Sequence, residues 1–444
     1  MAEKTRNGTL TEGPITSSLL RFSLPVIASM LVTQLTSLAD TMVVGNLMDA
    51  NALAAVSNAA TILMYFTFIS GGMELAGGLL VAARGPVSTQ KQMTALTWTL
   101  LAVDVAVSIV MLGLGVLLFR PLLLLINTPE EILAQALLYG RIYLCGLPFL
   151  MLYDLSRQIM IGCGISGMAM YFGLGTSVLN IVLDLLLVGP LGVAGAALAS
   201  AASQAAGFVC VAVWLRRNLL TERFRLSMVR KDCLKDILRL APPNTVQQMS
   251  GTLVTSIKQS LLGSLGVAAI AGYSCAYKVS YFIQIPIFGA AQALVTFIAQ
   301  NAAVHQEARI REGIRAAYRL LFILTAVLCA LCILLREPIL RLFTSDEEAL
   351  TLGILMLAWE PPSYLIQVLR HVQEAQLRGR QRMALYLTSS ISAMAVGVLA
   401  CTILVHLTGF AAFYLSSYVS AIYAAICSGL LVRYAKRHPA GASA

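Results

Sequence analysis

The sequence predicts an all-α integral membrane protein, with twelve transmembrane helices in two pseudo-symmetric six-helix bundles. Three observations support this prediction: the composition, the spacing of apolar runs, and the distribution of Lys and Arg. Of the 444 residues, 58% are hydrophobic and only 12% are charged, whereas a soluble domain has roughly 25% charged residues. Apolar runs of spanning length indicate that lipid is the solvent. Twelve helices with short loops leave no room for a soluble catalytic domain.

Apolar runs separated by Gly, Pro and charged residues place the twelve helices along the chain. The first run begins near Ile15 and extends to about Val44, which is too long for a cleavable signal peptide. The predicted spans are 15–45, 51–83, 93–118, 131–156, 168–188, 191–215, 236–263, 267–299, 315–335, 349–371, 383–406 and 409–432.

The basic residues fall almost entirely on one side of this topology. Of the 31 Lys and Arg, 25 lie at the termini or in loops on the side of the termini, and 3 lie in loops on the opposite side. Because cytoplasmic loops carry the excess of Lys and Arg, both termini are predicted to be cytoplasmic. The net charge of +10 is therefore a topology signal, and no nucleic-acid partner is expected. The remaining three basic residues lie within helices: Arg141, Lys258 and Lys278.

Three blocks of the first half recur in the second half, in the same order and at nearly constant offsets of 218, 216 and 215 residues. At these offsets Lys258 corresponds to Asp40, and neither equivalent of Asn180 and Asp184 is acidic. The matching blocks are 20–25 with 238–243, 65–66 with 281–282, and 168–171 with 383–386, and the 215-residue offset pairs Asn180 with Ala395 and Asp184 with Leu399.

The longest basic loop separates the two similar halves. The predicted organisation is an N-terminal six-helix lobe at 1–215, a cytoplasmic basic linker at 216–235 and a C-terminal six-helix lobe at 236–444. Six helices per half give both halves the same orientation in the membrane. In transporters built from such parallel repeats, the site lies between the halves, and rocking of the halves alternates access to it.

Ionisable side chains inside the spans are functional candidates, because a buried charge is costly unless it is paired. Asp40 and Asp184 each lie five residues before a glycine at the outer end of a helix, which places both about 8 Å below the outer loops. Asn180 lies one turn below Asp184, and Ser200 lies at a similar depth in the next helix. These groups can bind a proton or a small hard cation. The expected coupling ion is H⁺, or Na⁺ at Asp40, Asn180 and Asp184, with no other cofactor.

A further set of polar residues indicates the substrate cavity. Lys258 is expected to face this cavity and to pair with an acid across the cleft between the lobes; the alternative is a lysine that snorkels to the outer surface. Glu360 precedes two prolines, where a broken helix often lines a cavity. Pro25 lies within the first helix and is expected to act as a hinge. The predicted cavity residues are Thr33, Thr36, Gln247, Thr255, Lys258, Lys278 and Glu360.

Three other intramembrane acids have less defined roles. Asp154 has Arg157 one turn away, which favours a structural ion pair. Glu74 lies among glycines, and Asp104 has no evident local partner, so a functional role stays open for both.

Signatures of other function classes are missing from the sequence. It contains no phosphate-binding GxxxxGK[ST] loop, no HExxH motif and no regular arginine ladder, so uphill transport would draw on an ion gradient. A membrane enzyme would need a clustered nucleophile–base or metal set, and the chain is therefore not expected to be an enzyme. A channel usually assembles repeated subunits, whereas this chain carries its own two-lobed symmetry and is expected to be a monomer.

These residues resemble the multidrug and toxic compound extrusion (MATE) transporters. The stretches 20–25, 40–45 and 52–56 are similar to the family's first helix and following loop, and 180–184 with 192–200 to its fifth and sixth helices. The paired Asp40 and Asp184 resemble the branch named for DNA-damage-inducible protein F. Residues that resemble the family's eighth helix are Gly289, Gln292, Gln300, Asn301 and Arg309.

The resemblance implies specific roles for individual residues. Asp40, Asn180 and Asp184 match the family's coupling positions, and Pro25 matches a proline where bending of the first helix has been proposed. Ser200 stands where the family usually has threonine. Thr36 stands where the branch has tyrosine, so this chain lacks the aromatic side chain that would contact a drug at that position.

The resemblance implies an antiporter of a bacterial cell (inner) membrane. It would export organic, amphipathic or cationic drug-like compounds in exchange for H⁺ or Na⁺, by alternating access between the two lobes. The alternative in the same superfamily is a flippase for lipid-linked oligosaccharide or lipid, whose larger cationic cavity would use Lys258, Lys278 and Arg141. The expected partners are a small organic substrate, the coupling cation and the lipid bilayer.

Overall fold

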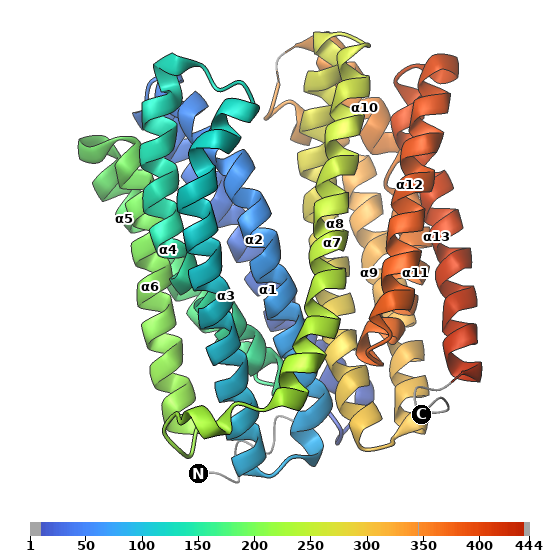
Figure 1. The fold of residues 1–444 in the computed structure, drawn as a ribbon. Coiled ribbons are helices and arrows are strands. Elements are labelled where there is room, and N and C mark those ends of the chain that lie inside the picture. The colour runs from blue at the N-terminus through green and yellow to red at the C-terminus, as the bar shows by residue number, and fades with distance from the viewer. Residues whose placement is uncertain (1–9, 345, 439–444) are drawn as a thin grey trace. The chain divides into compact units, whose positions relative to one another are not determined.

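The structure is a computed structural model that describes residues 10–344 and 346–438. Within these ranges the chain forms thirteen α-helices and two short 3-10 helices and has no strand (Figure 1). The two termini that were predicted to be cytoplasmic, 1–9 and 439–444, lie outside the described residues. The described chain forms two compact units: residues 28–245, here called the first unit, and residues 10–27 with 246–438, called the second unit.

The helices follow the predicted order. The first half of the chain contains α1 (Ile15–Leu47), α2 (Ala50–Arg84), α3 (Gln90–Leu125), α4 (Glu130–Gly162), α5 (Ser166–Leu191) and α6 (Val193–Asn218). The second half contains α7 (Lys231–Gly263), α8 (Val267–Ala303), α9 (Glu307–Leu340), α10 (Glu347–Trp359), α11 (Pro362–Gly379), α12 (Met383–Thr408) and α13 (Ala411–Arg437).

The predicted fold class is confirmed, with one helix interrupted and one unusually polar. Ten described helices are long and apolar enough to span a membrane, and the pair α10 and α11, bent by 50°, passes the same test when the two are taken together as one broken span. The break follows Glu360, where the sequence predicted it, because Pro361 and Pro362 cannot continue the hydrogen-bonding of α10. The twelfth predicted span is α7, whose polar face around Gln247 and Lys258 makes it less apolar than the others.

Several helices extend beyond the predicted apolar runs. The helix α3 begins at Gln90 rather than at 93, because Thr89 and Gln92 form a capping box. The helix α9 begins at Glu307 rather than at 315, so its first two turns are charged. Apolar periodicity identifies the part of a helix in lipid, whereas capping residues determine where the helix ends.

The turns between helices set the register of the internal repeat. Gly164 and Gln381 both adopt a positive φ, of 86° and 58°, after α4 and α11, and Gly192 and Gly409 do so at 55° and 57° after α5 and α12. Both pairs are 217 residues apart. The offset of 215 predicted for this part is therefore wrong by two residues, and the equivalents of Asn180 and Asp184 are Gly397 and Cys401.

The first helix of each half keeps the predicted offset of 218 residues. The buried positions 19, 22, 23 and 26 of α1 recur as buried positions 237, 240, 241 and 244 of α7. The division between the units, after Ile27 in α1 and after Thr245 in α7, recurs at the same offset. This register supports the pairing of Asp40 with Lys258.

Each of these two helices contributes to both units. The start of α1, up to Ile27, belongs to the second unit, and the start of α7, up to Thr245, belongs to the first. Pro25 and Pro243 each lie two residues before the division, and α1 continues as a helix through Pro25. The predicted hinge therefore lies next to the division, at a backbone position that lacks one helical hydrogen bond.

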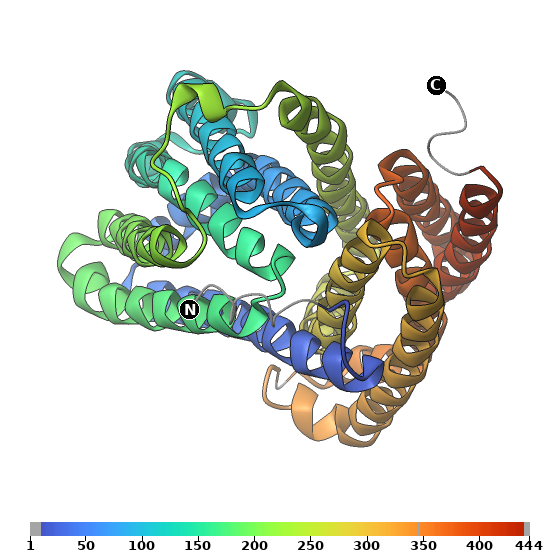
Figure 2. The ribbon, with the colours of Figure 1, turned by 90° about the horizontal axis from the view of Figure 1, so that it is seen from below.

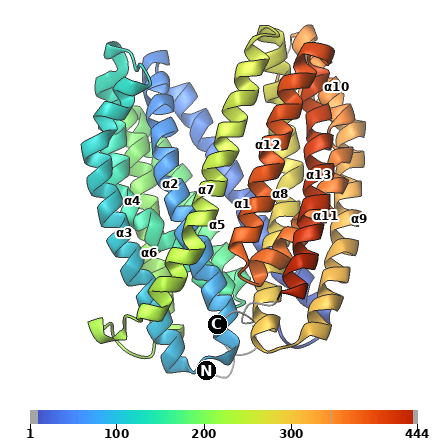
Figure 3. The same ribbon diagram turned by 45° about the vertical axis from the view of Figure 1, so that its right-hand side comes forward.

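Close contacts between helices position the interior of the first unit. Gly192 turns the chain between α5 and α6, and a Cβ on Gly195 would lie only 2.1 Å from the carbonyl oxygen of Leu187. Likewise, a Cβ on Gly162 of α4 would lie 2.6 Å from the carbonyl oxygen of Gly78 in α2. These glycines let the helices approach closely, and Figure 3 shows α2, α3, α4, α5 and α6 grouped together.

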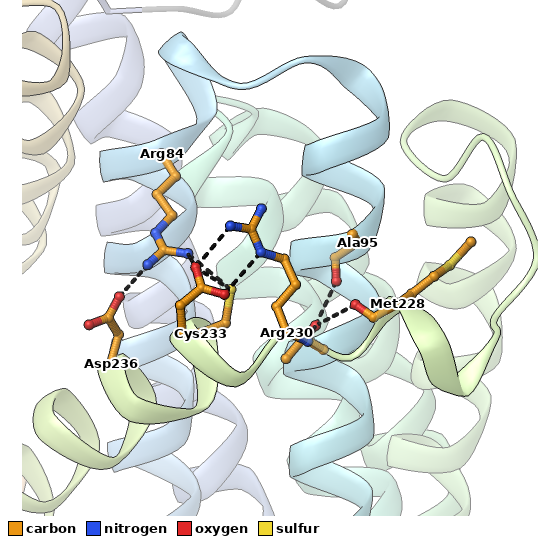
Figure 4. A network of polar contacts seen from close by, with 8 residues as sticks. Arg84, Ala95, Met228, Arg230, Cys233 and Asp236 are labelled. Atoms are coloured by element: carbon orange, nitrogen blue, oxygen red, sulfur yellow. Dashed lines mark hydrogen bonds and ion pairs between the residues drawn. The ribbon is translucent and has the colours of Figure 1, made fainter.

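The basic segment between α6 and α7 packs on the first unit. Its 3-10 helix (Leu226–Met228) lies against α3, where the amide of Arg230 donates a 3.2 Å hydrogen bond to Oγ1 of Thr99. Arg84, the last residue of α2, forms ion pairs with Asp232, at 3.1 Å, and with Asp236 (Figure 4). The segment predicted as a linker is thus attached to α2 and α3.

The start of the described chain packs on the second unit. The guanidinium group of Arg309 donates hydrogen bonds to the carbonyl oxygens of Leu10, Glu12 and Gly13, at 3.2, 2.7 and 2.8 Å. The amide of Leu10 donates to Oε1 of Gln300 at 2.8 Å. Gln300 and Arg309, noted above for their family resemblance, therefore hold this segment against the ends of α8 and α9.

Candidate functional site

Two carboxyl groups lie together in the interior of the first unit. Asp184 of α5 is fully buried, with 0% of its surface exposed, and Asp40 of α1 is half-buried. The two carboxyl groups are within hydrogen-bonding reach of each other. Among the described residues, no donor reaches either oxygen of Asp184 or Oδ1 of Asp40. Two adjacent carboxylates without donors repel each other, so the pair favours binding a proton or a cation.

Beside this pair is a polar cavity of about 400 Å³. Its walls come from α1, α2, α4, α5 and α6, all in the first unit. A space of this size with polar residues in its walls can hold several water molecules, so it offers water access to the carboxyl group of Asp40. The predicted residues that line it are Thr33, Thr36, Asp40, Asn180 and Ser200.

The predicted coupling residues Asn180 and Ser200 meet Asp40 at this cavity, as their predicted depths require. The buried Nδ2 of Asn180 has no acceptor among the described residues. The hydroxyl groups of Thr33 and Thr36 donate to the carbonyl oxygens of Ser29 and Val32, at 3.0 and 2.8 Å. The threonine oxygens can therefore still accept hydrogen bonds from the cavity.

Two tyrosines were not predicted from the sequence. Tyr139 of α4 interacts electrostatically with both Asp40 and Asp184, and Tyr143 with Asp40. Their rings stack at 6.2 Å, and both line the cavity. Their spacing of four residues on one helix was the available signal. Aromatic residues are common in membrane helices, so this spacing alone does not distinguish a cavity wall from a helix packing face.

Three more acids interact with one another in the same unit, and an arginine, Arg157, interacts with two of them, Glu74 and Asp154. Asp154 and Arg157 form the expected ion pair at 3.8 Å, and Arg157 also donates to Oγ of Ser29 at 2.6 Å. Glu74 and Asp104 both interact electrostatically with Asp154. Asp104 is fully buried, and neither of its oxygens has a donor among the described residues. Acids therefore outnumber bases in this interior.

The second unit holds its intramembrane acid differently. Glu360, only 9% exposed, accepts hydrogen bonds from Ser280 and Ser417, each at 3.2 Å. Lys258 provides a positive charge that interacts with this carboxylate. Glu360 thus has two donors and a cation within its own unit.

Two backbone carbonyl groups at the helix break next to Glu360 also have side-chain hydrogen-bond donors. The carbonyl oxygen of Trp359 accepts a 2.6 Å hydrogen bond from the hydroxyl of Tyr418. The carbonyl oxygen of Pro361 accepts one from Sγ of Cys329 at 3.1 Å. Two carbonyl groups at the bend between α10 and α11 therefore accept hydrogen bonds from side chains of α9 and α13.

The other predicted cavity residues lie in the second unit. Gln247, Thr255 and Lys258 are half-buried along α7, and the hydroxyl of Thr255 donates to the carbonyl oxygen of Gly251 at 3.2 Å. Lys278 is exposed on α8. Of the basic residues considered for a flippase, Arg141 is likewise exposed. Among the described residues, no group of three or more His, Cys, Asp or Glu is arranged to hold a metal ion.

Curated relatives of similar length cover most of the chain. The chain is 26% identical over 360 residues to the probable multidrug resistance protein YoeA of Bacillus subtilis, covering 79% of this chain and 78% of the relative. It is 20% identical to the multidrug export protein MepA of Staphylococcus aureus, covering 80% and 79%.

Solved structures share the whole fold. An outward-facing multidrug resistance MATE family transporter of the MOP superfamily has a TM-score of 0.89 at 22% identity, covering 96% of each chain. A mutant of the Vibrio cholerae MATE transporter VcmN has a TM-score of 0.89 at 20% identity, covering 95% of this chain and 97% of that one. At these identities the likeness establishes the fold alone.

The family model described as MatE matches residues 25–186 and 243–403, one match in each half of the internal repeat. Members of this family are multi-pass membrane transporters and not enzymes. The repeat, the helix order and both matches lead to one conclusion: the chain belongs to the MatE family.

Proposed function

We propose that this chain is a multidrug exporter that exchanges organic compounds for H⁺, with Asp40 and Asp184 as the coupling pair. Its relatives are named multidrug resistance and multidrug export proteins. The observation that supports the coupling site most strongly is the pair itself: two carboxyl groups within reach of each other, with no donor to either oxygen of Asp184.

The pair provides a physical reason for exchange. With one proton shared between the two groups, the pair carries a single negative charge. Without the proton, the pair carries two adjacent charges in the membrane interior, which is costly unless a cation replaces the proton. A cationic or amphipathic compound that interacts with the unprotonated pair would therefore compete with the proton, and this competition is the coupling that antiport requires.

The contacts favour H⁺ over Na⁺. Two carboxyl groups in hydrogen-bonding reach can share a proton with no other ligand. A sodium ion needs several oxygen ligands. The buried Asn180 atom that has no partner is the nitrogen Nδ2, and an amide nitrogen that carries hydrogens does not coordinate a cation. The acids around Arg157 favour protons as well, because Asp104 has no donor for either oxygen.

The flippase alternative has less support. Within the second unit, the positive charge of Lys258 interacts with Glu360 and is thereby partly neutralised, and both Arg141 and Lys278 are exposed. The remainder of the proposal concerns the setting of the transporter: a monomer in the plasma membrane of a bacterium, with both termini in the cytoplasm, as the Lys and Arg distribution predicts.

Transport in proteoliposomes tests the coupling ion. Accumulation of a fluorescent cationic drug inside the vesicles is measured with an imposed pH gradient at equal Na⁺. It is then measured with an imposed Na⁺ gradient at equal pH. The proposal expects the pH gradient alone to drive accumulation. Accumulation driven only by the Na⁺ gradient would replace H⁺ by Na⁺, and accumulation driven by neither gradient would contradict the antiport mechanism.

A further inference from the structure

A separate cavity lies within the second unit, between α9, α11 and α13, with a volume of about 560 Å³. Four basic side chains line it. Arg311 and Arg315 come from the first turns of α9, and Arg433 and Lys436 come from the last turns of α13. Because the members of each pair are four or three residues apart, each pair lies on one face of its helix.

The positive charge of this cavity is not balanced locally. None of the four side chains forms an ion pair with an acid in the part of the chain that the structure describes. Glu307 interacts electrostatically with Arg311 and Lys436, but its carboxylate is bound by Arg380 at 2.7 Å. The lining residues include no Asp or Glu.

The polarity of the cavity changes along the helices. The basic residues are nearest the start of α9 and the end of α13, which lie at the lower end of this unit in Figure 1 and face the viewer in Figure 2. One to two turns further into the helices, the lining becomes apolar, with Tyr318 from α9 and the exposed Ile426 and Leu430 from α13. Gln373 and Gln376 of α11 add amide groups to the lining.

We propose that this cavity binds an anionic glycerophospholipid of the cytoplasmic leaflet. Its phosphate would contact Arg311, Arg315, Arg433 and Lys436, and its acyl chains would follow the apolar wall. The order of charge and apolar surface in the cavity matches the order of phosphate and hydrocarbon in a lipid. Basic pockets between transmembrane helices on the cytoplasmic side are the kind of site that binds such headgroups.

The excess of basic residues at cytoplasmic helix ends does not by itself account for this arrangement. Membrane topology depends on the number of basic residues at these helix ends and not on their grouping in a cavity. Arg319 of α9 and Arg437 of α13 provide charge on the same helices without lining the cavity. These two residues are therefore matched controls: the same helices and the same residue type, but outside the cavity.

The test is lipid binding to the detergent-purified full chain, measured by native mass spectrometry during titration with phosphatidylglycerol. Each basic residue near an anionic lipid contributes a factor of about five in affinity. The double substitution Arg315→Gln with Arg433→Gln should therefore weaken phosphatidylglycerol binding about thirty-fold. The control pair Arg319→Gln with Arg437→Gln should bind like the unsubstituted chain, and phosphatidylcholine should bind weakly to all three.

A second pair, Arg311→Gln with Lys436→Gln, should repeat the loss, and gel filtration checks that each variant is folded. All substituted side chains are exposed, so folding should be unaffected. Equal losses in the control pair, or equal binding of phosphatidylcholine, would overturn the proposal. Full displacement of the lipid by inorganic phosphate would also overturn it, because the site would then be one for a free anion. The readout does not depend on transport, so it is independent of the proposed function.

Discussion

The two units treat one buried intramembrane acid each, Asp184 and Glu360, in opposite ways. In the first unit, Asp184 is fully buried, and no donor among the described residues reaches its carboxylate. In the second unit, Glu360 accepts hydrogen bonds from two serines and interacts with Lys258. Burial is similar in the two places, so the difference lies in the partners.

This contrast shows what the internal repeat shares and what it does not. The turns and helix ends of the two halves correspond closely, yet Asp40 corresponds to Lys258 and Asp184 corresponds to Cys401. The repeat therefore duplicates the scaffold without the acid pair. In the second unit Lys258 supplies a positive charge that interacts with Glu360, whereas in the first unit no donor among the described residues reaches Asp184, where we propose that the coupling ion binds.

Removing the acid pair should have the largest effect. Asp40→Asn and Asp184→Asn should each reduce gradient-driven efflux in proteoliposomes by about a hundredfold or more, because an amide cannot exchange the proton. Glu360→Gln is the matched change in the second unit and should keep most of the efflux. Equal losses in all three variants would remove the assigned difference between the units.

The second prediction concerns stability. Glu374 of α11 is buried and pairs with Arg370 at 2.8 Å, so Glu374→Leu leaves a buried arginine uncompensated and should lower the free energy of unfolding by about 3–5 kcal/mol. Asp104→Asn in the first unit should cause no loss, because Asp104 has no partner to lose. Melting temperatures of the purified proteins measure both effects. A large loss for Asp104→Asn would reveal a partner for that carboxyl group.

The third prediction concerns the lysine of the second unit. Lys258→Met removes the positive charge that interacts with Glu360, so a cationic drug should bind roughly fivefold more tightly. Lys258→Arg keeps the charge and serves as the control. Equilibrium binding of a cationic drug and of a neutral analogue distinguishes a charge effect from a change in shape. Unchanged binding and transport in Lys258→Met would show that Lys258 does not influence substrate.

The smallest effect is expected at the ion pairs of Figure 4, which join the end of α2 to the start of α7. Hydrogen bonds from Arg230 hold the pKa of Asp232, which precedes the predicted span, below its ordinary value of 3.8. A lowered pKa adds stability above the ordinary value, and this stability is lost as pH falls below about 4.

Because Asp232 is largely exposed, Asp232→Asn should cost only about 0.5 kcal/mol at pH 7. The difference in melting temperature from the unsubstituted chain should shrink as pH falls below 3.8 and disappear only below the lowered pKa of Asp232. Glu337→Gln in the second unit, which removes an exposed pair with Arg341, should change the melting temperature only slightly at pH 7. A difference that persisted at low pH would show that Asp232 acts through something other than its charge.

The sequence alone located the helices, the break after Glu360 and the depth of the acids. Depth follows from counting residues along a helix, and this placed Asp40, Asn180 and Ser200 at one cavity. The direction in which a side chain faces depends on how neighbouring helices pack. For that reason, Ser280 and Ser417, which donate to Glu360 from α8 and α13, were not anticipated.

Two other differences have similar physical causes. The repeat offset at the fifth helix of each half is 217 residues, whereas the short sequence match at Met168 predicts 215. The turns that fix the offset are seen only in the structure. The segment 216–235 was predicted as a linker from its charge, but Thr99 and Arg84 attach it to the first unit. Local composition does not indicate which surface a polar loop will contact.

The most direct test of the account is to count protons released when a drug binds. The purified protein is mixed with a cationic drug in weakly buffered solution, and a pH indicator reports the change. The account predicts that the unsubstituted chain and Glu360→Gln release about one proton per bound drug, and that the double variant Asp40→Asn with Asp184→Asn releases none. Undiminished release by the double variant, or loss of release only in Glu360→Gln, would contradict the assignment of coupling to the first unit.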